Sequence, residues 1–425
     1  MKYKLLVLTL VCLQLACTTQ NDEPPKLQLE RPTKALLVSR ENADAAEPSI
    51  ASDGERVYVA YVEKYPDGGG DLYVRSYDVT NNKLGEPVRV NWIAGEVKSW
   101  NGDPPTLVIE HGIPHVGWTA EYPNGGKGTI LYHSLSHDGG ATFDQPTRVN
   151  DDTEPASHGM HSMAIAPDGR IVFAWLDERY LRNEKSESEH NNPESGSHNS
   201  NSAGHNSQIE NRNSQMSAAE PDAELYFAIS TDGGKTFGSN RRIDEKICPC
   251  CKTSTVISAT GQIFVGYRKV YENNFRHITI IKSSDGSNFD NPVLVSDDKW
   301  QLNACPVSGP ALRVENNMLN VAWYAGGEAR PHGIYTALFS LDTLNAILVP
   351  VEIDKFEGAV SATWAGKHLV YSKEGEIRTK SADTQTKDLS KGKNVVAAES
   401  NGQLVHAYTN EKAVWLNTSR STPEK

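Results

Sequence analysis

The sequence predicts an all-β fold in which similar four-stranded sheets surround a common axis, a β-propeller. Two recurrences point to it: an apolar strand followed by a turn and an aromatic-rich strand, and a hairpin built on Asp-Gly. The 33 Gly and 22 Pro residues suit a chain rich in turns. Alternation with a period of two residues is typical of strands that pack on neighbouring sheets. Repetition of one supersecondary unit along a chain indicates a repeat architecture.

The first strand of the unit recurs seven times. The copies are residues 48–54, 105–112, 162–169, 254–261, 310–316, 359–366 and 395–402. Seven copies predict seven blades. The last copy ends near Thr418 without an outer strand of its own, and residues 35–39 have a sequence that could supply it. We therefore expect an N-terminal strand to close the ring, which would leave no open sheet edge.

The Asp-Gly hairpins are the most regular feature of the chain. They occupy residues 136–143 (SHDGGATF), 230–237 (STDGGKTF) and, in a shorter form, 283–289 (SSDGSNF). Asp and Gly supply the tight turn, while Ser and Thr bond nearby backbone groups. These segments resemble the Asp-box (BNR) repeat of sialidases and other propellers. The resemblance implies a sialidase-like propeller with the boxes on the face away from the binding site. Sialidases have six blades, so six is the alternative count.

The N-terminus resembles that of an exported bacterial lipoprotein. Residues 1–16 have a basic start and a short apolar run, which is typical of a signal peptide. They end at Cys17 in a lipobox-like sequence, so we expect a lipid anchor there and a flexible tether over residues 17–32. Thr18, directly after the cysteine, favours anchoring of the protein in the outer membrane, where the protein would face the periplasm or the cell surface. Residues 33–425 are then a single propeller domain, with a disordered insert at about 182–222.

The charge balance excludes one class of partner. The chain carries a net charge of −12 and has no cluster of Lys or Arg beyond its N-terminal segment. Nucleic-acid-binding proteins present a basic patch or stripe. We therefore expect no nucleic-acid partner.

Polar residues collect in the loops that a propeller would bring together on the face opposite the Asp boxes. These loops lead into the first strands or join the second strands to the third. The candidate ligand-binding residues are His158, His161, Asp177, Arg179, Arg268 and Arg330. Polar loops that converge from adjacent blades make this face the default site. We expect it to bind a carbohydrate, another anionic ligand or a partner protein.

Four cysteines lie in the same set of loops: Cys248, Cys250, Cys251 and Cys305. An exported chain with an even number of cysteines favours disulfides. Three thiols within four residues make ordinary pairing awkward, so two of them could remain reduced. The alternatives are redox chemistry or a thiolate site for copper or zinc, assisted by His158, Met160 and His161.

The resemblance to sialidases implies three arginines around a substrate carboxylate, a Tyr–Glu nucleophile pair and an Asp acid. Ala46 stands where the first arginine belongs. Asp67 lies where the acid loop would be, although its Gly-rich surroundings also suit a simple turn. The catalytic residues are otherwise unassigned. The leading hypothesis is a non-catalytic binding module. The alternatives are an exo-sialidase-like glycoside hydrolase and a soft-metal or redox protein.

Overall fold

A computed structural model describes residues 27–29, 34–66, 68–100, 102–122, 126–181, 222–302, 304, 306–358, 361–381 and 385–423. These residues form antiparallel sheets, with a short 3₁₀ turn at Glu272–Asn274. Within them, no helix has the length and apolar character that a membrane span requires.

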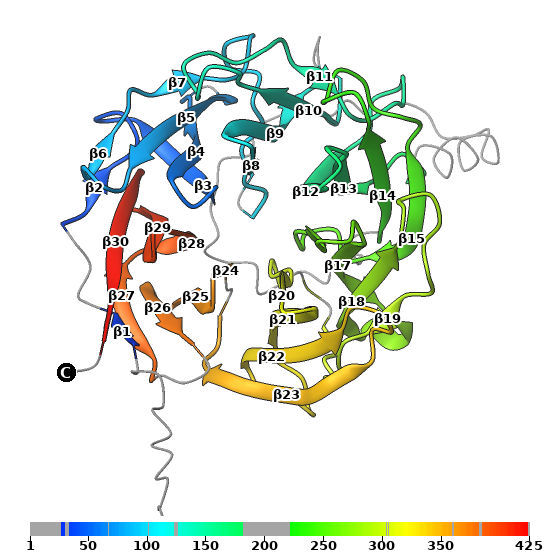
Figure 1. Ribbon diagram of the computed structural model, residues 1–425. Coiled ribbons are helices and arrows are strands. Elements are labelled where there is room, and N and C mark those ends of the chain that lie inside the picture. Colours follow the sequence, from blue (N-terminus) through cyan, green and yellow to red (C-terminus); the bar gives the residue numbers. More distant parts are fainter. Residues whose placement is uncertain are drawn as a thin grey trace, which may run out of the picture.

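The sheets surround a central axis, as Figure 1 shows. The strands nearest the axis are β3 (Asp44–Ser52), β8 (Thr106–Glu110), β12 (His158–Ile165), β16 (Ser254–Ile257), β20 (Ala311–Glu315), β24 (Ala362–Ala365) and β28 (Lys393–Ser400). Each coincides with one of the predicted first strands. Each contacts the next in chain order, and β28 contacts β3. No sheet of the described residues closes on itself, so packing between sheets forms the ring.

Further strands extend each sheet outward. The second strands are β4 (Arg56–Lys64), β9 (Ile113–Glu121), β13 (Ile171–Asp177), β17 (Ile263–Val270), β21 (Met318–Ala325), β25 (His368–Lys373) and β29 (Gln403–Asn410). The third strands are β5 (Gly70–Asp78), β10 (Thr129–Leu135), β14 (Ala223–Ser230), β18 (Arg276–Ser283), β22 (Gly333–Ser340), β26 (Glu376–Lys380) and β30 (Ala413–Pro423). The outer strands are β6 (Lys83–Leu84), β7 (Val88–Arg89), β11 (Thr147–Arg148), β15 (Arg241–Ile247), β19 (Val293–Leu294), β23 (Ala346–Lys355) and β27 (Lys387–Lys391).

Two pairings join parts of the chain that are otherwise separate. Strand β15 pairs with β17 only at Ile247 and Lys269, which links two four-stranded halves into one sheet. Strands β1 (Leu27–Leu29) and β2 (Leu36–Leu37) both pair with β30. The N-terminal part of the described chain therefore lies on the sheet formed by the C-terminal strands.

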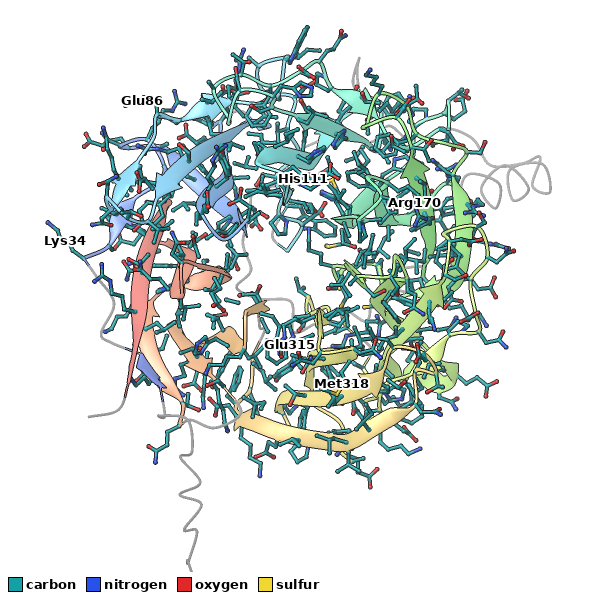
Figure 2. The ribbon with its side chains drawn as sticks, viewed as in Figure 1. Lys34, Glu86, His111, Arg170, Glu315 and Met318 are labelled. Carbon is teal, nitrogen blue, oxygen red and sulfur yellow. The ribbon has the colours of Figure 1, made fainter. Side chains whose placement is uncertain are left out.

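The core consists of apolar side chains packed between neighbouring sheets. Trp118, Trp175 and Trp323, each on a second strand, are at most 1% exposed. Burying a large apolar side chain contributes roughly 1.5–3 kcal/mol. Figure 2 shows the surface residues Lys34 and Glu86 at the rim, whereas Glu315, at the end of β20, lies close to the axis.

The Asp-Gly hairpins join third strands to outer strands, and side-chain hydrogen bonds close them. In the hairpin after β14, Gly234 N donates to Ser230 Oγ at 2.9 Å, and Thr236 N donates to Asp232 Oδ1 at 3.0 Å. The hairpin after β10 has the same bonds. Gly233 and Gly234 have φ values of 75° and 87°, the left-handed region that favours glycine.

Three inner strands contain a β-bulge at the same place. The pairing shifts within β3 between Ala46 and Ser49, and β12 and β28 have equivalent shifts. Each bulge holds one residue with positive φ: Glu47 (54°), Met160 (51°) and Asn394 (52°). Bulges redirect side chains at the rims of closed β-structures and next to functional sites.

Candidate functional site

The loop face is the face on which loops lead from outer strands into the next inner strand. Asp-Gly hairpins follow the third strands at the opposite ends of the sheets. The inner strands border an open cavity of about 540 Å³ that is lined by residues of β8, β12, β16, β20 and β24. Its lining does not include the polar group described next.

Four polar residues form a group on this face, which we call the central cluster: Glu47, Asp103 and His161, which are buried, and Lys252, whose side chain is 26% exposed. His161 Nδ1 lies 3.3 Å from Asp103 Oδ1, and Lys252 Nζ lies 3.9 Å from the same oxygen. Lys252 also donates to the carbonyl of Pro104 at 2.7 Å. Each residue lies at the start of, or just before, an inner strand of consecutive sheets. The ring geometry therefore brings them together.

Burial determines the protonation of this cluster. Glu47 is 2% exposed, and burial raises its pKa to about 7. His161 is fully buried, and burial lowers its pKa. Glu47 can therefore hold a proton near neutral pH while His161 is neutral. The cluster offers a proton donor, two potential acceptors and a cation within one buried region.

The loop that carries Asp103 also exposes large apolar side chains. Trp92 is 56% exposed, Ile93 67% and Trp100 55%. All three lie in the loop between β7 and β8, and Asp103 N donates to the carbonyl of Trp100 at 3.0 Å. An exposed apolar patch rimmed by polar groups is typical of a binding surface. One loop thus supplies both a buried carboxylate and two solvent-facing indole rings.

The cysteines form a second group beside the central cluster. Cys248, Cys250 and Cys251 are at most 3% exposed, and their sulfur atoms all lie within 4.8 Å of one another. Cys248 and Cys251 are free thiols with their sulfurs 3.5 Å apart. Cys250 Sγ lies 3.9 Å from Cys248 Sγ. The thiols pack in one apolar cluster with Met160.

Two buried arginines surround these thiols. Arg276 Nη1 donates to Cys248 Sγ at 2.9 Å, and Arg268 holds the carbonyls of Ser308 and Tyr324. The hydrogen bond from Cys251 and the charges of both arginines lower the pKa of Cys248 to about 6. Burial and the neighbouring Cys248 raise the pKa of Cys251 well above its ordinary value. Cys248 is thus the more acidic of the two thiols, and Cys251 is the one that keeps its proton and donates to it.

The other predicted ligand-binding residues make internal contacts. His158 Nε2 lies 3.0 Å from Asp152 and 3.4 Å from Asp177. Arg179 contacts Asp177 at 2.9 Å and Asp151 at 2.8 Å. Desolvation opposes the charge of Arg179, but the bonds to Asp177 prevail and raise its pKa. These groups form a polar network at the side of the central cluster.

Arg268 and Arg330 are also engaged within the chain. Arg268 is fully buried, and its guanidinium lies 4.9 Å from the centroid of the Trp300 ring. Arg330 Nε donates to Ser296 Oγ at 3.0 Å and lies 3.3 Å from Asp298. Arg179 and Arg330 thus pair with acidic side chains, and Arg268 is held by backbone carbonyls.

Some predicted features lie outside the described residues. They are the candidate acid Asp67, Cys305, the lipidation candidate Cys17, the signal peptide at 1–16, most of the tether at 17–32 and almost all of the insert at 182–222. These remain predictions.

Sequence reasoning missed Glu47, Asp103 and Lys252 as site residues. Each immediately precedes a predicted first strand or stands two residues before it, as His161 also does. That shared position in consecutive repeats is a signal that could have identified the central cluster.

Comparisons with known proteins support the fold. No model of a known protein family matches the chain, and no curated protein matches it in sequence. A structure of unknown function from Dyadobacter fermentans covers 92% of this chain and 99% of its own, with 13% identity and a TM-score of 0.51. A polysaccharide lyase of family PL25, an ulvan lyase, covers 91% of this chain and 95% of its own, with 12% identity and a TM-score of 0.50. A Trypanosoma rangeli sialidase gives 8% identity and a TM-score of 0.46, with 92% of this chain and 58% of that chain covered.

The chain therefore has an all-β, propeller-like fold that is shared with solved proteins at low identity. Fold does not determine function, so function is argued from the site.

Proposed function

We propose that this protein binds a carbohydrate on its loop face. The observation that carries the proposal is the loop between β7 and β8, which presents Trp92 and Trp100 to solvent and inserts Asp103 into the central cluster. Its amphipathic indole rings suit the apolar faces of sugar rings. The buried polar groups beside them suit hydroxyl or carboxylate groups. The similarity to a polysaccharide lyase is consistent with this ligand class.

The arrangement supports binding over sialidase-type hydrolysis. A sialidase would need arginines that are free to grip a carboxylate. Arg179 and Arg330 contact acidic residues, and Arg268 is bound to backbone carbonyls. Ala46 replaces the first arginine of that family. Asp67 remains a candidate for the catalytic acid, and its position in the sequence is what supports that role.

A glycoside hydrolase or lyase of another type is the second candidate. One observation favours it: Glu47, which burial keeps protonated near neutrality, lies in the same cluster as Asp103 and His161. Pairs of titratable groups whose environments separate their pKa values are typical of general acid–base sites.

Direct binding measurements test the proposal. The purified full-length protein is screened against a glycan array, and hits are titrated by calorimetry. We expect Trp92→Ala and Trp100→Ala each to weaken binding by roughly 5- to 100-fold, since an aromatic contact contributes about 1–3 kcal/mol. Leu348→Ala removes an equally exposed apolar residue (55%) from outer strand β23 and is the matched control. Equal affinity of the wild type and both Trp variants would exclude the loop face as the binding site. Product formation from a bound glycan would favour the enzyme.

We also propose that the ring has seven blades and is closed by β2 on β30. The inner strands contact one another in a full circle, and Leu36 pairs with Leu416. In this arrangement an N-terminal strand provides hydrogen-bond partners for the backbone groups at the edge of the C-terminal sheet.

The export signals complete the proposal. We propose lipidation at Cys17 and an outer-membrane location, which follow from the sequence of the leader. Cys17→Ser would then release the protein from the membrane fraction into the soluble fraction. We further propose that Cys250 pairs with Cys305, because Cys248 and Cys251 are free thiols. Peptide mapping without reduction tests this pairing.

A further inference from the structure

Cys248 and Cys251 form a compact pair of free thiols within the loop face. Their sulfurs are 3.5 Å apart, and both residues are fully buried. A tight turn fixes the spacing, since Cys251 N donates to the carbonyl of Cys248 at 3.3 Å. Cys248 N in turn donates to the carbonyl of Arg268 at 2.9 Å. The backbone therefore holds the two sulfurs together without help from a bound group.

A buried guanidinium contacts the sulfur of Cys248 directly. Arg276 is 5% exposed, and its donors contact Cys248 Sγ and the carbonyl of Leu302. Arg268 is fully buried and bonds backbone carbonyls. The charges of Asp222 and Asp298 act on Arg276 and Arg268 respectively. The hydrogen bond from Arg276 favours the thiolate form of Cys248, because a neighbouring cation stabilises a thiolate.

We propose that Cys248 and Cys251 bind one monovalent soft metal ion, Cu(I), between their sulfurs. Cu(I) takes the place of the proton on Cys251: the S–H bond breaks, the proton leaves to solvent, and two metal–thiolate bonds form. One positive charge replaces another, so the net charge beside the arginines is unchanged. Thiolates are soft ligands that favour Cu(I), zinc and iron–sulfur clusters over harder cations.

The same charge balance disfavours Zn(II). A divalent ion would add one positive charge next to two buried guanidinium groups. Structural zinc sites also require four ligands in a tetrahedron. Only two free thiols are available among the described cysteines. The site therefore fits a two-coordinate ion.

The arginines also oppose a disulfide between the two thiols. Oxidation would convert the thiolate of Cys248 into a neutral sulfur and leave the Arg276 guanidinium buried without its anion. A thiolate that is stabilised in the reduced form makes the corresponding disulfide a strong oxidant. The reduced pair is therefore the favoured state, and apolar neighbours such as Met160 and Leu225 shield it from water.

Anaerobic metal titration of the reduced full-length protein tests the proposal. Competition with the Cu(I) chelator bathocuproine disulfonate gives the affinity, and native mass spectrometry gives the stoichiometry. We expect one Cu(I) per chain, the loss of two titratable thiols on loading, and no retention of Zn(II) after buffer exchange. Failure to retain Cu(I), or retention of Zn(II) with equal affinity, would overturn the proposal. A Cys248–Cys251 disulfide in protein alkylated at the moment of cell lysis would overturn it as well.

Variants separate the ligands from their surroundings. Cys248→Ser and Cys251→Ser are each expected to weaken Cu(I) binding at least 100-fold, with circular dichroism checking that they fold. Met160→Leu is the matched control, since it keeps the volume of the apolar neighbour and leaves both thiols. It should retain one Cu(I); loss of the ion in this variant would refute a two-thiolate site. Trp92→Ala should also retain it, which separates this inference from carbohydrate binding. If a cysteine variant does not fold, the Cu(I) and Zn(II) titrations of the wild type still test the proposal.

Discussion

Arg268 shows how the environment of a residue changes its role. In the sequence it follows Tyr267 at the end of a strand, where an arginine suggests a ligand contact. In the structure it is fully buried, it donates to the carbonyls of Ser308 and Tyr324 at 2.9 Å, and its guanidinium lies over Trp300. It thereby ties β17 to the loop before β20 and to β21.

We therefore expect Arg268→Met to lower the free energy of unfolding by about 3–5 kcal/mol. The substitution keeps much of the volume but leaves buried carbonyls without donors, and each unsatisfied group costs about 1–3 kcal/mol. Urea denaturation measures the change. Arg420→Met, at an exposed arginine of β30, is the control and should cost far less. Similar losses for both variants would contradict the structural role of Arg268.

The raised pKa of Glu47 predicts that the stability of the folded protein depends on pH. Its pKa is raised from 4.5 to about 7, so the folded state binds this proton more tightly than the unfolded state does. The contribution to stability is complete below pH 4.5 and is lost as the pH rises to about 7. Glu47→Gln mimics the neutral form. At pH 8 it should be more stable than the wild type by about 1–3 kcal/mol, and at pH 4.5 nearly equal to it. Thermal unfolding at both pH values checks this, and a gain of equal size at pH 4.5 would contradict the assignment to Glu47.

At the scale of elements, the Asp-Gly hairpins were predictable because every signal in them is local. The turn glycines, the bonding Ser and Thr, and the following Phe lie within eight residues of one another, as in residues 230–237. The strands were predictable for the same reason, since alternation and turn residues occur within each copy. The bulges were not, because glutamate and methionine at positions 47 and 160 give no sign of a left-handed backbone.

Substitutions at two adjacent glycines in one hairpin allow the energetic cost of backbone strain to be measured apart from the cost of a steric clash. Gly233→Ala and Gly234→Ala both place a side chain at positive φ, which costs about 1 kcal/mol. A Cβ at Gly233 meets nothing within 4 Å, whereas one at Gly234 would lie 2.3 Å from His133 Cε1. We expect Gly234→Ala to destabilise the protein by about 1–3 kcal/mol more than Gly233→Ala. Chemical denaturation compares them, and equal losses would show that the ring of His133 can move aside.

At the scale of the whole molecule, the ring brings together residues that the sequence keeps apart. Glu47 and Lys252 are separated by more than two hundred positions, and no local pattern links them. The sequence could predict that loops converge on one face, since that follows from the repeat. It could not predict which polar side chains would be buried there. The arginines illustrate this, because the same loops also contain the carbonyls and carboxylates that bind Arg179, Arg268 and Arg330.

The proposed closure of the ring by the N-terminal strand makes a testable prediction. Val38 is fully buried, and its backbone N donates to the carbonyl of Val414 at 2.8 Å. Deleting residues 34–39 would expose the edge of β30 and the apolar side chains beneath it. We expect the truncated protein to unfold at a lower temperature, with the C-terminal sheet becoming sensitive to protease first. The control is a protein that lacks the residues up to position 33 and therefore keeps β2. Equal protease resistance of the two truncated proteins would contradict closure by β2.

The bulge residues carry a cost in backbone energy. At position 394 the left-handed backbone is filled by asparagine, a residue that tolerates it, and glycine would be the easiest choice at all three places. Glu47 and Met160 occupy it at a cost of about 1–3 kcal/mol each. Two side chains next to the candidate site are therefore held in a conformation that their own backbone disfavours, and the packing around them must supply the energy that keeps them there.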